Sequence, residues 1–310
     1  MRAGIRIGVV LSAGGVRGVY AHTGFLQAIE NLNLPIAAVA GCSAGAIVGG
    51  VYASGTPLQD WTQALDQLQP ENFWQPGSVR RSLWELLAFR GRKFTGISKT
   101  DAALAFCRKH LAVRYFEQCQ VPFHALAICL ASGEKTVFSE GELAPRIVAS
   151  SAIPLLYQPV EIDGEHYCDG AVIDLAPTDA ICCKHDLDVL IVHHVANRTR
   201  GFHGTDMVAG NSWPMVEILD TLLFRHRPWY LSDQALTFRR CPCGCKVLIV
   251  VLEPELPELP WPQTGQGRDV WSQAMDQVKK LLKPHAKALC NNPEALQPLI
   301  MPVKEVLNKP

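Results

Sequence analysis

Short apolar runs alternate with glycine-rich turns and amphipathic stretches in the N-terminal part of the chain. The run IRIGVVL at residues 5–11 predicts a largely buried strand, and residues 19–32 have the periodicity of a helix. Residues 36–40 predict the next strand, and the small residues at 44–54 predict a second helix. Because strand, turn, helix and strand follow in this order, we expect a right-handed crossover and a parallel sheet with helices on its faces.

One uncharged stretch raises the question of a membrane span. Residues 36–53, IAAVAGCSAGAIVGGVYA, carry no charged side chain and are just long enough to cross a bilayer. The glycines and the break at Pro35 favour instead a strand and a small-residue helix inside a globular core. The apolar run at the N-terminus lacks a small-residue cleavage site. We therefore expect neither a transmembrane segment nor a signal peptide.

The rest of the pattern predicts a cap and a C-terminal part around the core. Residues of about 57–120 are more charged and helical, and we expect them to form a helical cap insertion. Residues of about 200–310 predict a helical part packed on the core, within a single domain over 1–310. The other predicted elements are hairpins around 132–133 and 163–164, strands at 188–194 and 246–252, and an amphipathic helix at 268–290.

Charge and cysteine content limit the classes of partner. The 29 basic and 29 acidic residues of this 310-residue chain cancel, so no global charge attracts nucleic acid, and contact with a membrane surface would have to be local and apolar. The 11 cysteines are odd in number and scattered. This distribution differs from a secreted disulfide framework and favours a reducing cytoplasm.

The sequence GCSAG at residues 41–45 has the form GxSxG and lies where a predicted strand turns into a predicted helix. This context is typical of a nucleophile elbow, in which the serine is exposed on a tight turn. Gly41 and Gly45 would remove the β-carbons that clash there, and Ser43 would be the nucleophile. The alternative is a small-residue turn that packs a helix closely on a sheet.

A glycine cluster after the first strand, GGVRG at residues 14–18, suggests that a ligand or an oxyanion approaches the main chain. In acyl transfer, backbone N–H groups stabilise the tetrahedral oxyanion, and we assign this role to Gly14 and Gly15, with Val16 as a further candidate. Gly18 would allow close helix packing, and Arg17 would brace the loop or meet a phosphate.

A nucleotide site is the rival interpretation of the same loop. The pattern GxGxxG finds Ala13 in its first position, and no acidic residue lies about 20 residues further on to bind a ribose. A phosphate-binding P-loop would need a lysine after the last glycine, and the chain has none there. Both details oppose nucleotide binding.

Ser43 needs a base, and two kinds of residue compete for that role. His193 and His194 end a predicted strand, but adjacent residues point to opposite faces, which favours a structural role. Asp169 precedes Gly170 on a tight turn with little bulk around it, which makes it the better candidate. A turn-capping aspartate is the alternative.

Four ordered pieces of sequence resemble the patatin-like phospholipases, in particular the bacterial branch related to the esterase domain of neuropathy target esterase. They are GGVRG at 14–18, GCSAG at 41–45, ASSAIP at 149–154 and DGA at 169–171. The resemblance extends over residues 5 to about 195. The chain departs from the family pattern at Ala13, where a first glycine is usual, and at DLAP, 174–177, where an asparagine-leucine-proline run is common.

The resemblance implies a three-layer α/β/α fold with a mostly parallel sheet, and a Ser43–Asp169 dyad without histidine. It implies a lipid acyl hydrolase of the phospholipase A, lysophospholipase or carboxylesterase type that needs no cofactor and no metal. Because a free aspartate has a pKa of about 3.9, this dyad requires a desolvated carboxylate or a very short contact to the serine. The alternatives are a transacylase or a catalytically silent binding protein of the same fold.

Two further features are not part of this motif set. Cys241, Cys243 and Cys245 alternate in RRCPCGCK, whereas zinc ligands are usually two to four residues apart, so we expect incidental thiols rather than a metal site. Trp61, Trp74 and Trp84 would form either a lipid-facing surface or the core of the cap, and we favour the core.

Overall fold

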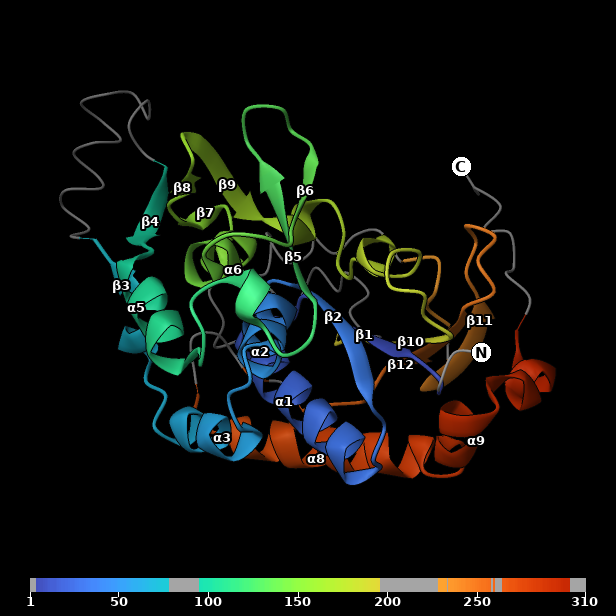
Figure 1. Ribbon diagram of the computed structural model, residues 1–310. Coiled ribbons are helices and arrows are strands. Elements are labelled where there is room, and N and C mark those ends of the chain that lie inside the picture. Colours follow the sequence, from blue (N-terminus) through green and yellow to red (C-terminus); the bar gives the residue numbers. More distant parts are fainter. Residues whose placement is uncertain are drawn as a thin grey trace, which may run out of the picture.

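The computed structural model describes residues 4–77, 95–195, 228–232, 234–257, 259 and 264–301 (Figure 1). Trp84, with part of the expected cap, and a large part of the expected C-terminal region lie outside these ranges. The described residues form an α/β structure around a central, mostly parallel sheet, as the sequence predicts.

The central sheet has nine strands in the order β11-β12-β10-β1-β2-β5-β9-β8, with β6 also paired to β5. Its five middle strands, from β12 to β5, are parallel, and the remaining pairings are antiparallel. The bounds are β1 Ile7–Leu11, β2 Ile36–Cys42, β5 Phe123–Cys129, β6 Lys135–Phe138, β8 Val160–Ile162, β9 Glu165–Asp169, β10 Val189–His193, β11 Leu236–Arg240 and β12 Leu248–Leu252.

Alternation along the middle strands divides the core into two faces. In β10, Ile191 packs with the helices on one face, whereas Leu190 and Val192 belong to the cluster on the other. Successive strand residues point to opposite faces, so a strand that is buried on both faces must be largely apolar, as β1, β12 and, up to its last residue His193, β10 are. This arrangement explains why these strands are continuous apolar runs in the sequence.

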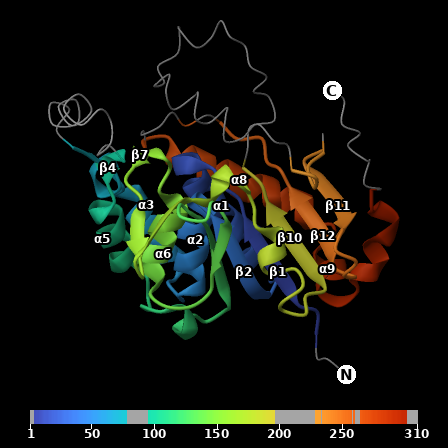
Figure 2. The ribbon, with the colours of Figure 1, turned by 90° about the horizontal axis from the view of Figure 1, so that it is seen from above.

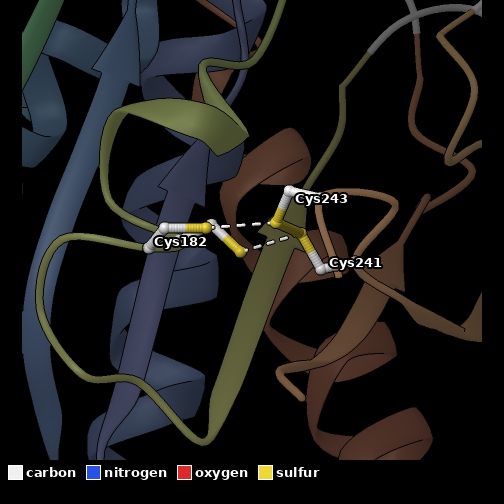
Figure 3. Close-up of side chains that lie close together, drawn as sticks. Cys182, Cys241 and Cys243 are labelled. Atoms are coloured by element: carbon white, nitrogen blue, oxygen red, sulfur yellow. Dashed lines mark hydrogen bonds between the residues drawn. A yellow bond between two sulfur atoms is a disulfide. The ribbon is translucent and has the colours of Figure 1, made fainter. Parts of the chain in front are cut away.

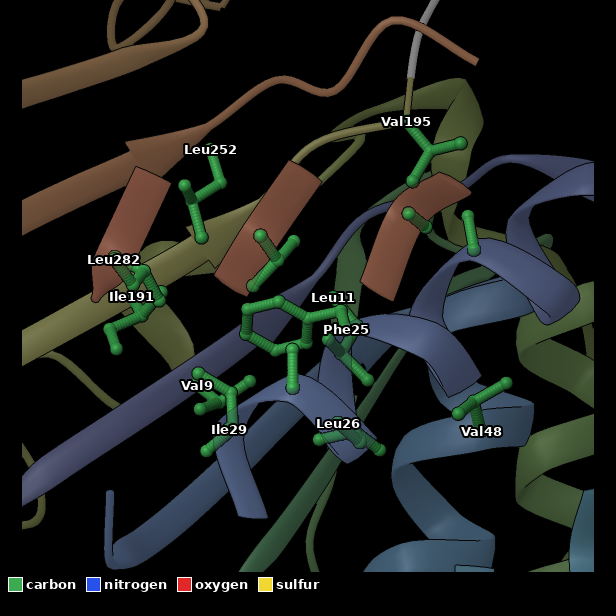
Figure 4. Packing of buried hydrophobic residues seen from close by; sticks show 14 of the residues in the cluster. Val9, Leu11, Phe25, Leu26, Ile29, Val48, Ile191, Val195, Leu252 and Leu282 are labelled. Carbon is green, nitrogen blue, oxygen red and sulfur yellow. The ribbon is translucent and has the colours of Figure 1, made fainter. Parts of the chain in front are cut away.

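The larger core cluster lies beneath the sheet, where α1 and α8 run side by side (Figures 1 and 2). Phe25 of α1 packs there with Val9, Leu11 and Ile191 of the sheet and Leu282 of α8 (Figure 4). The helix bounds are α1 Gly15–Asn31, α2 Ala44–Ala53, α3 Leu58–Asp66, α5 Asp101–His110, α6 Leu143–Ser151, α8 Gly267–Leu282 and α9 Ala286–Asn291.

The opposite face is covered, among the described residues, by the segment around the short helices η3 (Gly170–Val172) and η4 (Thr178–Ala180) and by Tyr230. Ala180 and Ile181 of this segment are buried against the sheet. Sheet and coverings thus make three layers.

Most of the expected elements are present, and some differ. The uncharged stretch 36–53 divides into β2 and α2, and both expected hairpins, β5-β6 and β8-β9, join the sheet. The first helix begins at Gly15 instead of residue 19, and the single helix expected at 268–290 is divided into α8 and α9, with Pro284 between them. Within the parts of the chain that the structure covers, no helix has the length and apolarity needed to cross a bilayer.

The expected cap is not purely helical, which corrects the prediction for residues 57–120. It contains α3, α5 and the short helices η1 (Pro70–Asn72) and η2 (Phe116–Gln118), but also β3 (Gln75–Pro76) and β4 (Gly96–Lys99). These strands form a second sheet, β3-β4-β7, with β7 (Leu155–Tyr157). β11 was also not expected from the sequence. β3, β4 and β7 have only two to four residues and no flanking turn signal of a hairpin, and β11, LTFRR, ends in two arginines, so none of them forms a recognisable apolar run.

Candidate active site

Ser43 lies between β2 and α2 with a backbone φ of 55° and ψ of −119°. A side-chain-bearing residue rarely adopts this conformation, which costs of the order of 1–3 kcal/mol and is common at functional sites. The flanking glycines make the turn sterically feasible, because a β-carbon on Gly41 would lie 2.2 Å from the Gly45 carbonyl oxygen and one on Gly45 would lie 2.1 Å from that of Leu11. This is the strand-to-helix geometry that the GxSxG pattern predicts.

β5 determines where Asp169 lies relative to this turn. At Leu126, β5 pairs with Cys42 of β2 and with Val137 of β6. At the next residue, Ala127, it pairs with Asp169 of β9 and with Thr136 of β6. A strand has only two edges, and β6 occupies one of them in both pairings. The end of β2 and the end of β9 therefore meet on the same edge of β5.

The Ser43 side chain faces the Asp169 carboxylate closely enough to favour its ionised form and so to lower the pKa of the carboxyl. Asp169 is 1% exposed, and this burial raises the pKa of its carboxyl from 3.8 to about 6. Hydrogen bonds from the Ala171 N–H and the Cys42 thiol, together with the nearby Ser43 side chain, act in the opposite direction and limit the rise. At neutral pH the carboxylate is thus ionised, yet much more basic than an exposed aspartate.

Ser150 and Cys42 complete the surroundings of the turn. The Ser43 N–H donates to the Ser150 Oγ at 3.0 Å, and Ser150 is fully buried at the end of α6. The sequence motif ASSAIP contains Ser150, but no spacing rule identifies its contact. Burial and the nearby Asp169 carboxylate raise the pKa of the Cys42 thiol, so this residue stays protonated and is a poor nucleophile.

The glycine cluster forms the start of α1 beside Ser43. The N–H groups in the first turn of a helix have no carbonyl acceptor within that helix. In α1 the first backbone hydrogen bond runs from the Gly18 N–H to the Gly14 carbonyl, so the N–H groups before Gly18 are not used in the helix. Gly15 has a φ of +56° and, with Val16, lines the same pocket as Ser43. Arg17 donates to the Val195 carbonyl at 2.7 Å, which favours the bracing alternative for this side chain.

Gly18 and Gly170 lie at close contacts next to the two turns. A β-carbon on Gly18 would lie 2.9 Å from that of Ala44 at the start of α2, in agreement with the expected close packing of helices. A β-carbon on Gly170 would lie 2.5 Å from Leu126 Cγ of β5. Gly18 and Gly170 therefore allow α1 to pack closely against α2, and η3 to pack closely against β5.

His193 and His194 are buried and have partners other than Ser43 and Asp169. The Nδ1 atoms of His193 and His22 lie 2.8 Å apart, and the Tyr230 hydroxyl lies 3.2 Å from His194 Nδ1. Burial lowers the pKa of His22 to about 4 and of His194 to about 3, and burial also lowers that of His193. All three rings are therefore neutral at pH 7, as expected for a structural role. The His22 Nε2, at 2.7 Å from the Ser12 carbonyl oxygen, supports the loop before Gly14.

An apolar pocket opens beside Ser43 and extends towards α3 and α5. The residues at its inner wall are hydrophobic: Val19, Ile47, Trp61, Leu65, Phe106 and Tyr157. Trp61 and Trp74 are buried, as the core interpretation predicts, and Trp61 donates from its ring nitrogen to the Thr23 hydroxyl. The pocket has the apolar lining and few polar groups that are typical of sites for a hydrocarbon ligand.

A serine on a strained strand-to-helix turn at the carboxyl end of a parallel strand has the geometry of a nucleophile elbow. The family model for patatin-like phospholipase matches residues 9–181, which is more than half of the chain. The chain belongs to the patatin-like phospholipase family.

Curated relatives come from the same branch that the sequence motifs indicate. An uncharacterized NTE family protein of Mycobacterium tuberculosis is 34% identical over 172 residues, which cover 56% of this chain and 44% of the relative. Lysophospholipase NTE1 of Cryptococcus neoformans is 28% identical over 189 residues, 61% of this chain and 11% of that protein. The chain thus matches less than half the length of these relatives.

Among solved structures, human GIVD cytosolic phospholipase A2 has a TM-score of 0.55 at 10% sequence identity, covering 92% of this chain and 60% of that one. Its complex with methyl gamma-linolenyl fluorophosphonate gives a TM-score of 0.51. At this identity the likeness concerns the fold alone, and it confirms the expected fold class.

Proposed function

We propose that the protein is a serine acyl hydrolase that cleaves acyl esters of lipids through a Ser43–Asp169 dyad. Asp169 accepts the Ser43 proton as the hydroxyl oxygen attacks the ester carbonyl carbon. The backbone N–H groups of Gly14, Gly15 and Val16 stabilise the oxyanion. Asp169 then protonates the leaving alcohol, and water repeats the sequence on the acyl-enzyme.

The observation that supports this proposal most is the position of the buried Asp169 carboxylate beside the Ser43 turn, because the ends of β9 and β2 meet at consecutive residues of β5. An exposed aspartate would be too weak a base, because its pKa lies several units below the operating pH. The raised pKa of about 6 brings Asp169 into the range in which a carboxylate is both ionised and basic.

The pocket supports a lipid as the acyl donor. It is lined by apolar side chains from α1, α2, α3 and α5, and Ser43 is on its wall. A hydrocarbon chain in this pocket would bury its surface, with a gain of about 0.8 kcal/mol for each methylene removed from water. The ester carbonyl would then lie between Ser43 and the first turn of α1.

Peripheral membrane contact belongs to the proposal. Leu155, Val172 and Ile173 are exposed by 40–47%, and the hydrogen bond from Asp169 N–H to the Ala152 carbonyl brings their two segments together near the site. We define these three residues as the apolar rim. We place the protein in the cytoplasm, an assignment supported by the nine of 11 cysteines outside any disulfide.

Covalent labelling with a fluorophosphonate tests the dyad directly. The wild-type protein should be labelled in stoichiometric amount and should hydrolyse a short-chain aryl ester. Ser43→Ala should lose both, and Ser132→Ala, at an exposed turn, should retain both. Intact mass spectrometry measures the label, and circular dichroism checks that each variant is folded.

Two results would contradict the proposal. One is labelling that persists in folded Ser43→Ala protein, which would place the nucleophile elsewhere. The other is a folded wild-type protein that neither reacts with the probe nor hydrolyses any member of a panel of phospholipids, lysophospholipids and acylglycerols. The second result would favour the silent binding protein.

A further inference from the structure

Five of the 11 cysteines converge from two segments that lie far apart in the sequence. Figure 3 shows Cys182 of one segment beside Cys241 and Cys243 of the other. Cys182 and Cys183 follow η4, whereas Cys241, Cys243 and Cys245 lie between β11 and β12. The Sγ atoms of Cys182 and Cys241 are 3.1 Å apart, as are those of Cys183 and Cys243, and those of Cys183 and Cys245 are 2.7 Å apart. The partner pair that the sequence pattern lacked is Cys182 and Cys183.

This cysteine cluster lies at the opposite end of the sheet from Ser43. β10 and β12 are parallel and pair Val189 with Leu248 at their amino ends, and both cysteine segments lie just before those residues. Ser43, in contrast, follows the carboxyl end of β2. A strand of five residues separates the two ends by roughly 16 Å. The cluster is therefore distinct from the proposed catalytic site.

We propose that Cys182, Cys183, Cys241 and Cys243 form a tetrathiolate site for Zn²⁺. Their four Sγ atoms all lie within 4.8 Å of one another. A tetrahedral ion with Zn–S bonds of about 2.3 Å holds its sulfur atoms about 3.8 Å apart, so binding needs shifts of about 1 Å at the closest pairs. Four sulfur donors in a tetrahedral arrangement select Zn²⁺ over harder ions.

Charge in the flanking sequence fits a bound tetrathiolate. Four thiolates around Zn²⁺ have a net charge of −2, which favours nearby cations. Arg240 precedes Cys241, Lys184 follows Cys183, and Lys246 follows Cys245. All three basic residues are exposed. They can approach the site without the cost of burying a charge.

The ion requires the dithiol form of Cys241 and Cys243, which are joined as a disulfide in the structure. Two equivalents of a small thiol reduce this bond: they supply two electrons and two protons, the protein gains two thiols, and the reductant becomes a disulfide. Zn²⁺ then displaces four thiol protons as its four bonds to sulfur form. The disulfide and the zinc site are thus alternative states of one cluster.

The function that this geometry assigns to the site is structural. Four protein ligands leave no open position on the metal, as in structural rather than catalytic zinc sites. The bound ion would join the segment after η4 to the β11–β12 turn, and both segments pack on the same face of the sheet. Binding should therefore stabilise the fold and leave reaction with fluorophosphonate unchanged.

Metal content of reduced protein tests the site. Protein reduced with a phosphine and dialysed against Zn²⁺ should hold one equivalent by elemental mass spectrometry, and its melting temperature should rise by at least about 5 °C. With Co²⁺ instead, it should show the intense absorption of a tetrahedral thiolate complex. Cys183→Ser and Cys243→Ser, both at exposed positions, should lose the metal and the thermal shift.

Matched controls decide the ligand set. Cys290→Ser changes a cysteine outside the cluster and should retain the full equivalent. Cys245→Ser should also retain it, because this residue lies outside the group of four. Substoichiometric binding by reduced wild-type protein, or binding that persists in Cys183→Ser and Cys243→Ser, overturns the site. Because Ser43 labelling is measured on the same samples, this outcome is distinguishable from failure of the proposed hydrolase.

Discussion

The two ends of the parallel strands differ in the kind of residue that they collect. At the carboxyl ends, Ser43 has an unfavourable backbone conformation and Asp169 has a buried carboxylate. At the amino ends, the cysteine cluster brings together thiols from two segments at distances that suit a disulfide or a shared metal ion. Strain and desolvation lower stability, whereas a metal or a disulfide raises it. The comparison indicates that the proposed catalytic residues at the carboxyl ends lower the free energy of unfolding, and that a cross-link at the amino ends can raise it.

Asp169→Asn should separate activity from stability most strongly. We expect kcat/KM to fall by at least about 10³-fold, because the amide cannot accept the serine proton. The free energy of unfolding should rise by up to about 3 kcal/mol above pH 6, because the folded carboxyl has a pKa of about 6 against 3.8 when unfolded. Ester hydrolysis and urea denaturation measure the two effects.

The sign of this stability effect follows from proton linkage. Between pH 3.8 and about 6 the folded state holds the Asp169 proton and the unfolded state releases it, so the wild-type protein loses stability as pH rises. Asp169→Asn lacks this loss, and the two proteins should therefore differ little near pH 4. A variant that is less stable than the wild type at pH 8 would contradict the assignment of Asp169 as a costly buried charge.

Ser150→Ala should test how far the conformation of the Ser43 turn depends on the hydrogen bond from the Ser43 N–H to the Ser150 hydroxyl. The change leaves the buried Ser43 N–H without its acceptor, which costs about 1–3 kcal/mol, and we expect kcat to fall by about 10- to 100-fold. Ser54→Ala is the control for loss of a buried serine hydroxyl, since Ser54 also accepts a backbone N–H, from Ala112, which shares that N–H with the Thr56 hydroxyl. Equal loss of activity in both variants would mean that Ser150 acts only through general stability.

The pH dependence of kcat/KM should show the ionisation of the Asp169 carboxyl. Asp169 acts as a base only when it is ionised, so kcat/KM should fall by about tenfold per pH unit below its pKa of about 6 and level off above it. A profile of kcat/KM between pH 4.5 and pH 8 gives the apparent pKa of Asp169. The substrate should be a soluble ester that does not itself ionise in this range. An inflection near 4 would show that Asp169 is not desolvated during the reaction.

The apolar rim should produce the smallest effect. Leu155→Ser should reduce hydrolysis of phospholipid in vesicles by about three- to tenfold and leave hydrolysis of a soluble aryl ester unchanged, because it removes apolar area from the membrane contact. Leu299→Ser is the control, with similar exposure next to β11 at the far edge of the sheet. If both variants lose the same amount on vesicles, the rim is not the contact surface.

The sequence predicts the fold where apolar runs are long and glycines mark the turns. β1, β2, β10 and β12 are continuous buried runs, and GCSAG at 41–45 identifies the turn that carries Ser43. The turn before Gly170 suggests Asp169, and the resemblance to a known family adds its role as base, although Asp169 also caps η3 by accepting from the Ala171 N–H. The turn at Ser43 was predictable because its local geometry restricts the residue type at Gly41 and Gly45.

Features that depend on pairing between distant segments could not be predicted. The contact of Ser150 with Ser43 arises from the packing of α6 against α2, and the partners of Cys241 and Cys243 come from the register of β10 with β12. The small β3-β4-β7 sheet joins strands separated by much of the chain. Single-sequence patterns contain no information on such pairings, because each partner alone satisfies only its own local propensity.

β5 has a consequence for how this architecture can vary. Leu126 and Ala127, its consecutive residues, align the ends of β2 and β9, so the spacing between Ser43 and Asp169 is set by backbone pairing and not by the loops between them. Insertions around α3 and α5 can reshape the pocket while the proposed catalytic pair keeps its alignment. One inserted residue within β5 would shift the register by about 3.4 Å and turn side chains to the opposite face. The shape of the pocket and the alignment of Ser43 with Asp169 are thus encoded in separable parts of the chain.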